Sequence, residues 1–158
     1  MRKFTFGLFS LALLTLALGL IQAQAKTDFS GTWKINPGKT DFGPMPPPDS
    51  MVLKIAHEDP SLKVNLVQTG GTGDVTYDLV FTTNGKECVN HPDGEEAKST
   101  FKWEGGDLVS DTKGSSGGND FTAKDRWTLS DGGKTMTLQR HISTSGGDFD
   151  MKLVFDKQ

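Results

Sequence analysis

Apolar and polar residues alternate with a period of two along most of the chain after residue 28. The segment 75–82, VTYDLVFT, is a clear example. Such alternation is typical of strands in an antiparallel sheet that has one buried and one solvated face. Glycine-rich turns separate the alternating segments, and no segment shows a convincing helical period. The pattern therefore predicts an all-β domain.

The alternating segments predict about ten short strands at regular spacing, which favours a sandwich or a barrel. We expect them near residues 29–36, 51–57, 62–69, 74–83, 86–90, 96–104, 107–113, 120–129, 134–143 and 148–156. An up-and-down order allows the sheet to close on itself, which removes its edges. The predicted fold is an up-and-down antiparallel β-barrel.

Three two-residue turns allow the strand register to be predicted, because residues opposite each other in a hairpin share a face. Across residues 84–85, the expected pairs are Phe81 with Cys88 and Leu79 with Asn90. Across residues 105–106, they are Phe101 with Ser110 and Trp103 with Leu108. Across residues 132–133, they are Asp125 with Arg140, Trp127 with Leu138 and Leu129 with Met136. All three turns fall at one end of an up-and-down barrel. Bulky side chains gather near that end and smaller or polar ones further along, so we expect one plugged end and one roomier end.

The segment after the first strand is expected to form a non-helical flap. Residues 37–50 contain four prolines within the five positions 44–48, which exclude a helix. The first strand runs away from the plugged end, so this segment should emerge at the open rim. Phe42 and Met45 are expected to tuck inward from it.

Residues 1–25 have the pattern of a secretory signal peptide. Two basic residues precede an apolar run from Phe6 to Ile21, and Ala23-Gln24-Ala25 fits the small-x-small cleavage rule. The run is shorter than the ~20 residues needed to span a bilayer, which disfavours the alternative of an uncleaved anchor. We therefore predict that residues 26–158 form a domain exported to the periplasm or the cell exterior, with no membrane span after cleavage.

The start of the domain carries a short signature. Residues 29–33 read FSGTW, which resembles the Gly-x-Trp signature of the lipocalin and fatty-acid-binding (calycin) barrels. The whole domain further resembles exported lipocalin-like proteins abundant in acidobacteria, on the stretches 29–34, 41–44, 84–88 and 127–130. The resemblance implies a barrel in which Gly31 and Trp33 are a structural signature, with the tryptophan plugging the closed end. It implies no activity.

Two features depart from those families. Fatty-acid-binding proteins place a pair of helices between the first two strands, where this chain has its proline-rich segment. Lipocalins usually stack a late arginine on the tryptophan, and no arginine follows Arg140 here.

No catalytic motif has a supporting context. The G-x-S-x-G pattern at 114–118 lies between two strands instead of on a strand–helix turn. His57-Glu58 does not continue into H-E-x-x-H, the acidic loop at 91–96 is expected to be a solvated turn, and His141 should point outward. The sequence therefore predicts no enzyme, no cofactor and no metal site. The net charge of −3 does not indicate the basic surface that nucleic-acid binding requires.

The single cysteine excludes an intrachain disulfide. In an oxidising compartment a lone thiol is a liability unless it is buried. We therefore expect Cys88 to be a buried structural thiol.

Asp125 and Arg140 are the sharpest functional signal. Both are predicted to face inward on neighbouring strands, where an unpaired charge costs several kcal/mol, so they should pair with each other or with a bound group. One interpretation is a closed ion pair inside a filled barrel. The other is an arginine that also receives an anionic or polar head group, which its fork of donors suits.

Two functions follow. The first is a carrier of a small apolar or amphipathic molecule, with an anionic head group as one option. Its candidate ligand-binding residues are Tyr77, Ser99, Phe101, Ser110, Asp125 and Arg140. The second is a non-catalytic cell-surface or extracellular interaction module with a filled barrel. An interior cavity of about 300 Å³ or more favours the carrier.

Overall fold

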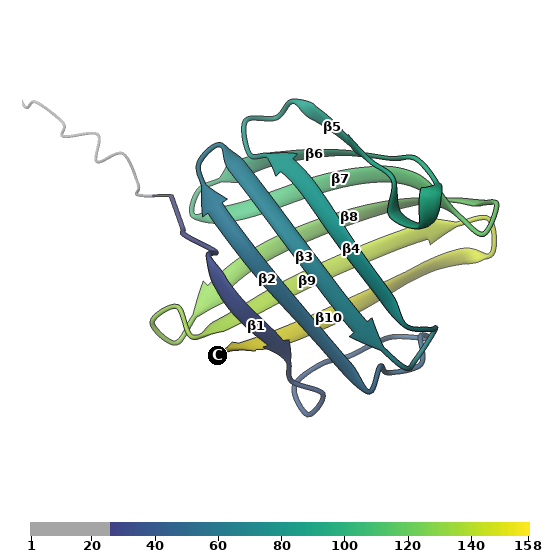
Figure 1. Cartoon of the computed structure of the whole chain (residues 1–158), viewed down its shortest axis with the longest axis horizontal. Coiled ribbons are helices and arrows are strands. Elements are labelled where there is room, and N and C mark those ends of the chain that lie inside the picture. Colours follow the sequence, from purple (N-terminus) through teal and green to yellow (C-terminus); the bar gives the residue numbers. More distant parts are fainter. Residues whose placement is uncertain (1–25) are drawn as a thin grey trace, which may run out of the picture.

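The computed structural model describes residues 26–158, so the signal peptide predicted at residues 1–25 lies outside the described part. The described chain forms ten strands and one short 3-10 helix (Figure 1). The elements are β1 (Gly31–Ile35), β2 (Ser50–Glu58), β3 (Ser61–Thr69), β4 (Val75–Thr82), β5 (Glu87–Asn90), η1 (Pro92–Gly94), β6 (Ala97–Glu104), β7 (Asp107–Ser116), β8 (Asn119–Ser130), β9 (Thr135–Thr144) and β10 (Gly147–Lys157). The predicted all-β fold of antiparallel strands is confirmed. Within residues 26–158, no helix has the length and apolar character to cross a membrane.

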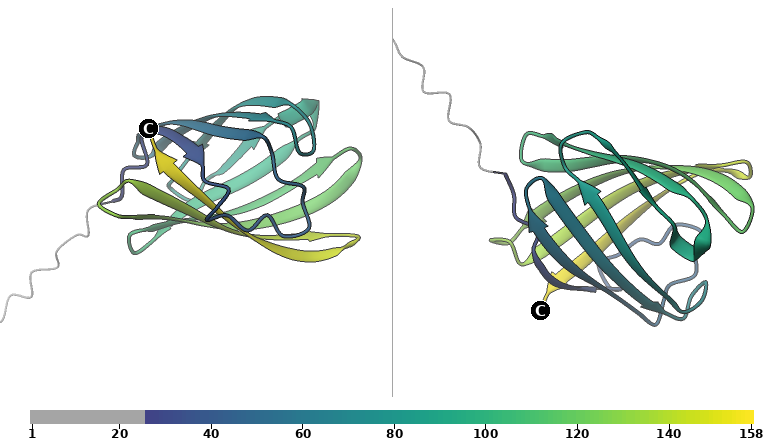
Figure 2. Two further views of the ribbon diagram at one scale, coloured as in Figure 1. Left: turned by 90° about the horizontal axis from the view of Figure 1, so that it is seen from below. Right: turned by 45° about the horizontal axis from the view of Figure 1, so that its top comes forward.

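The ten strands belong to one sheet that curls into a nearly closed barrel. Their order is β4-β3-β2-β1-β10-β9-β8-β7-β6-β5, and each pairs antiparallel with its neighbours. The pairing of β1 with β10 joins the two halves, so that β2, β3 and β4 cross in front of β6 to β10 in Figure 1. The two end strands of the sheet, β4 and β5, lie along the remaining gap (Figure 2). The expectation that closure removes every edge is therefore wrong at this one place.

Two of the three predicted hairpin registers are confirmed. Phe101 lies opposite Ser110 and Trp103 opposite Leu108 between β6 and β7. Between β8 and β9 the structure pairs Asp125 with Arg140, Trp127 with Leu138 and Leu129 with Met136.

The third register, across residues 84–85, is wrong because β4 and β5 form no ladder. The loop between them is held by other elements instead. The N–H of Thr83 donates to Pro60 O at 2.8 Å, and the N–H of Gly85 donates to Phe101 O at 2.8 Å. These two bonds turn the loop away from a tight hairpin, so the predicted pairs of Phe81 with Cys88 and of Leu79 with Asn90 do not form.

Side chains of β5 fill the place of the missing ladder. The amide of Asn90 binds both backbone groups of Val80, accepting from its N–H at 2.9 Å and donating to its carbonyl at 3.1 Å. The N–H of Thr82 donates to Cys88 Sγ at 3.2 Å. Cys88 packs against the core but is only half-buried. The prediction of an enclosed thiol is therefore wrong, because the thiol lies in the open seam and not inside a closed sheet.

Trp33 is fully buried in the core at one end of the barrel, as predicted. Its indole N–H donates to Phe29 O at 2.9 Å. Lys157 Nζ lies 5.1 Å from the centre of the Trp33 ring, so a lysine packs over the tryptophan where this sequence has no late arginine. Gly31 leaves room for that lysine, because a Cβ there would approach Lys157 Cε to 2.6 Å.

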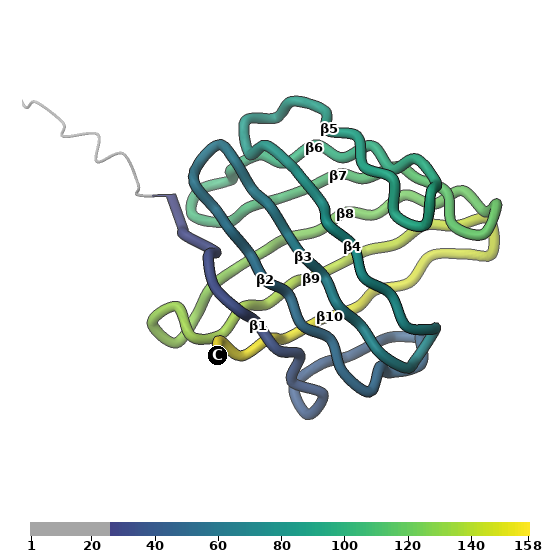
Figure 3. Tube along the Cα trace, in the orientation of Figure 1, coloured from purple at the N-terminus to yellow at the C-terminus, as the bar shows by residue number. Residues whose placement is uncertain are grey.

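The segment after β1 is non-helical, as predicted, and follows the neighbouring edge of β10 (Figure 3). Asp41 and Lys152 exchange backbone hydrogen bonds of 2.8 and 2.9 Å. Phe42 packs against the core, whereas Met45 remains 37% exposed. The inward orientation expected for Met45 is therefore wrong, because the segment is bound to β10 before it reaches this residue.

Candidate ligand-binding site

A cavity of about 290 Å³ lies inside the barrel, beyond the packed aromatic side chains of the closed end. One wall comes from β2, β3 and β4 and is apolar, with Met51, Leu53, Val64, Leu66 and Leu79. The opposite wall, from β6 to β9, mixes apolar and polar side chains and contains Phe101, Ser99, Thr112, Asp125 and Arg140. The interior is therefore amphipathic, and its volume lies at the lower limit of small-ligand sites.

Asp125 and Arg140 form a two-pronged ion pair in the polar wall. Arg140 Nε donates to Asp125 Oδ1 and Nη2 donates to Oδ2, both at 2.7 Å. The Asp125 side chain is 4% exposed, whereas that of Arg140 is 33% exposed. Arg140 lines this cavity and also a more open groove among outward-facing side chains such as Lys124 and His141. The Asp125 carboxylate raises the pKa of Arg140 above its ordinary value, so the guanidinium is charged at every physiological pH.

Five of the six candidate residues predicted from sequence line the cavity: Tyr77, Ser99, Phe101, Asp125 and Arg140. Ser110 lies behind the pair, where its hydroxyl donates to Asp125 Oδ2 at 3.5 Å. Ser99 is hydrogen-bonded to Thr112 at 2.8 Å, and either hydroxyl can be the donor. The alternation along β6 to β9 was sufficient to find this wall. The apolar residues from β2 to β4 were not predicted as ligand contacts. Alternation shows which of their side chains point into the barrel, but not which of those are packed in the core and which line a cavity.

The acidic loop at 91–96 is more than a solvated turn. The hydroxyl of Tyr77 on β4 donates to the carboxylate of Asp93 in η1, across the seam between β4 and β5. Burial and the neighbouring Asp93 carboxylate raise the pKa of Tyr77 to about 12, so its hydroxyl keeps its proton. Glu95 accepts a hydrogen bond from the N–H of Gly118 at 3.3 Å. The loop therefore connects β4 to the turn between β7 and β8 at the open end of the barrel.

The other motifs considered from sequence, the G-x-S-x-G pattern at 114–118 and His141, are not placed in the structural context that catalysis or metal binding requires. Residues 114–116 of the G-x-S-x-G pattern belong to β7, and the turn at 117–118 leads directly into β8. His141 is exposed and pairs with Asp150 at 2.7 Å. Residues 26–158 contain no group of three or more histidine, cysteine or acidic side chains placed to hold a metal ion.

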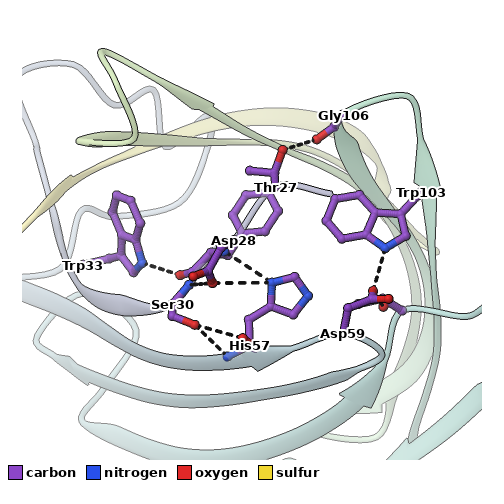
Figure 4. A network of polar contacts seen from close by, with 10 residues as sticks. Thr27, Asp28, Ser30, Trp33, His57, Asp59, Trp103 and Gly106 are labelled. Atoms are coloured by element: carbon purple, nitrogen blue, oxygen red, sulfur yellow. Dashed lines mark hydrogen bonds and ion pairs between the residues drawn. The ribbon is translucent and has the colours of Figure 1, made fainter. Parts of the chain in front are cut away.

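A second polar network closes the opposite end of the barrel (Figure 4). His57 is almost fully buried, and its ring stacks on Trp103 at 5.8 Å between ring centres. Its Nδ1 accepts a hydrogen bond from the N–H of Phe29 at 3.3 Å, while Nε2 is buried without a partner in the described chain. Burial lowers the pKa of His57 below its ordinary value of 6.5, and the carboxylates of Asp28 and Asp59 offset this only in part.

This burial predicts a pH dependence of stability. Because the folded protein holds His57 neutral, the unfolded chain binds the proton more readily below the ordinary pKa of 6.5. Stability should therefore be full above that pH and fall as the pH drops through the lower folded-state pKa. The free energy of unfolding, measured by urea denaturation between about pH 7.5 and about pH 5, should decrease in the natural protein more than in His57→Asn. Equal decreases would show that His57 is freely protonated in the fold.

No family model matches the sequence, and no curated protein matches it. Solved structures match in fold. The REP1-NXSQ fatty acid transporter has 16% identity over 83% of this chain and 96% of its own, with a TM-score of 0.57. A heat soluble (SAHS) protein from Ramazzottius varieornatus has 14% identity over 82% and 94%, with a TM-score of 0.59. The zebrafish ileal bile acid-binding protein, complexed with cholic acid, has 17% identity over 82% and 98%, with a TM-score of 0.53. At these identities the likeness is one of fold: the chain is a β-barrel of the lipocalin and fatty-acid-binding-protein type.

Proposed function

We propose that this protein is an exported, non-catalytic carrier that binds a small apolar or amphipathic molecule inside its barrel. The observation that carries the proposal is the cavity of about 290 Å³, with one apolar wall and one wall that holds a charged pair. The alternative function, an interaction module with a filled barrel, does not account for this cavity. Export is supported by the signal-peptide pattern of residues 1–25.

The structural neighbours support the same proposal. Two of them are described as a fatty acid transporter and a bile acid-binding protein, which are carriers of small amphipathic molecules. The apolar wall supplies burial for the hydrocarbon part of such a ligand, at about 25 cal/mol per Å² removed from water. The polar wall orients its head group.

Filling the cavity should abolish binding without unfolding the protein. Ala123 is buried and lines the cavity, so Ala123→Phe places a ring in the space that a ligand needs. We expect the affinity for the uncharged fluorescent probe Nile red, measured by fluorescence titration, to fall at least about tenfold. Ala56→Phe is the matched control, because Ala56 is exposed on β2.

The titration separates the two candidate functions. Binding by the natural protein and by Ala56→Phe, but not by Ala123→Phe, supports the carrier. Absence of Nile red binding by the natural protein contradicts it and favours the interaction module. Equal binding by all three proteins places the probe outside the barrel.

A further inference from the structure

The charged pair in the cavity has no net charge. Arg140 and Asp125 are joined by two hydrogen bonds of 2.7 Å, so the carboxylate lies against the edge of the guanidinium. The other polar residues of the lining are Tyr77, Asn90, Ser99 and Thr112, all uncharged, and Tyr77 holds its proton up to a pKa of about 12. Among the described residues that line the cavity, only Asp125 and Arg140 are charged. A ligand therefore meets a neutral but strongly polar wall.

The side of the pair that faces the ligand consists of donors. The bonds to Asp125 use the Nε–H and one Nη2–H of Arg140. Both Nη1–H groups and the second Nη2–H remain, because the hydrogen bonds of Arg140 within residues 26–158 involve only Nε and Nη2. Asp125 is nearly inaccessible, whereas the side chain of Arg140 lines the cavity and is one third exposed. The pair can therefore donate N–H groups to an acceptor atom of a ligand, whereas the Asp125 oxygens are almost inaccessible to a ligand donor.

These two facts disfavour an anionic head group. Moving a carboxylate out of water costs several kcal/mol, and offsetting this takes a closely paired opposite charge together with further hydrogen bonds. Here the attraction of Arg140 is opposed by Asp125, which holds the same sign as the ligand and lies within one hydrogen bond of the guanidinium. An uncharged carbonyl or amide oxygen has a much smaller desolvation cost and still receives the Arg140 N–H bonds.

We propose that the ligand carries an uncharged hydrogen-bond acceptor, such as a ketone, ester or amide carbonyl, and that Asp125 excludes carboxylates by neutralising Arg140. The inference rests on the carrier function proposed above and adds the chemical class of the head group. Arg140 is then the residue that positions the ligand, and Asp125 is the residue that determines specificity.

The proposal is tested with two probes of equal chain length, dodecanamide and dodecanoate, each competing with bound Nile red at about pH 8, where the acid is ionised. The natural protein should bind the amide at least about tenfold more tightly than the carboxylate. Asp125→Asn frees the charge of Arg140 at nearly constant volume, so dodecanoate should gain at least about tenfold relative to the amide. Ser110→Ala is the control, because Ser110 contacts Asp125 but carries no charge and does not line the cavity.

The outcomes are distinct. A preference for dodecanoate in the natural protein, or equal affinities, overturns the inference while leaving the carrier function intact, and this result needs no variant. If Asp125→Asn folds, as judged by circular dichroism and urea denaturation, and its preference is unchanged, Asp125 is not the specificity residue. If Nile red itself does not bind, the carrier function fails, and the inference fails with it.

Discussion

Trp33→Ala is expected to lower the free energy of unfolding by about 3–5 kcal/mol. Trp33 has no exposed surface and is among the largest of the fully buried side chains in the described chain. Its removal leaves a cavity in the core and deprives the Phe29 carbonyl of the indole donor at 2.9 Å. Closely packed surroundings relax only partly into such a space, so both losses should appear in urea denaturation.

Trp33→Phe is the matched control, because it keeps an aromatic ring and loses only part of the volume and the N–H group. It should cost less than the alanine variant. A loss below about 1 kcal/mol for Trp33→Ala would mean that the tryptophan does not plug the barrel.

Removing one partner of the internal ion pair should have an effect of similar size. Arg140→Met is expected to cost about 3–5 kcal/mol, because it leaves the Asp125 carboxylate almost inaccessible to water and without its cation. The partial exposure of Arg140 places the loss toward the lower end of that range. Asp125→Leu should be costly for the converse reason.

The double variant Asp125→Leu/Arg140→Met distinguishes a buried pair from two independent residues. Replacing both charges by apolar groups removes the desolvation penalty together with the attraction, so it should cost less than either single change. Single losses that simply add in the double variant would show that the two side chains do not interact in solution.

Local sequence pattern predicted the paired strands well where the turn residues had no competing partner. The turns at 105–106 and 132–133 connect neighbouring strands, and both registers followed from counting. The turn at 84–85 has the same sequence character, yet its backbone bonds to Pro60 and Phe101 instead. Those partners lie outside the turn and the two segments that flank it, so no count of residues around the turn could reveal them.

The candidate site divides in the same way. The pairing of Asp125 with Arg140 was predictable, because it follows from the register of one hairpin. The bond between Tyr77 and Asp93 was not, since it joins β4 to the short helix η1, and no ladder connects β4 to the segment that carries η1. The size of the cavity also lay beyond the sequence, because it depends on how far the aromatic side chains of the closed end extend.

The barrel can close only after β1 has paired with β10. Every other ladder joins strands that are consecutive along the chain, whereas this one brings Trp33 opposite Lys157. Contacts at such long separation are the slow ones to establish, because a large loop must close first. Until β10 (Gly147–Lys157) has docked, β1 and β9 each present an uncovered edge, and Lys157 is not in place over the Trp33 ring. β10 thus completes the sheet beside β1, and the partly folded chain is most vulnerable to aggregation before this pairing forms.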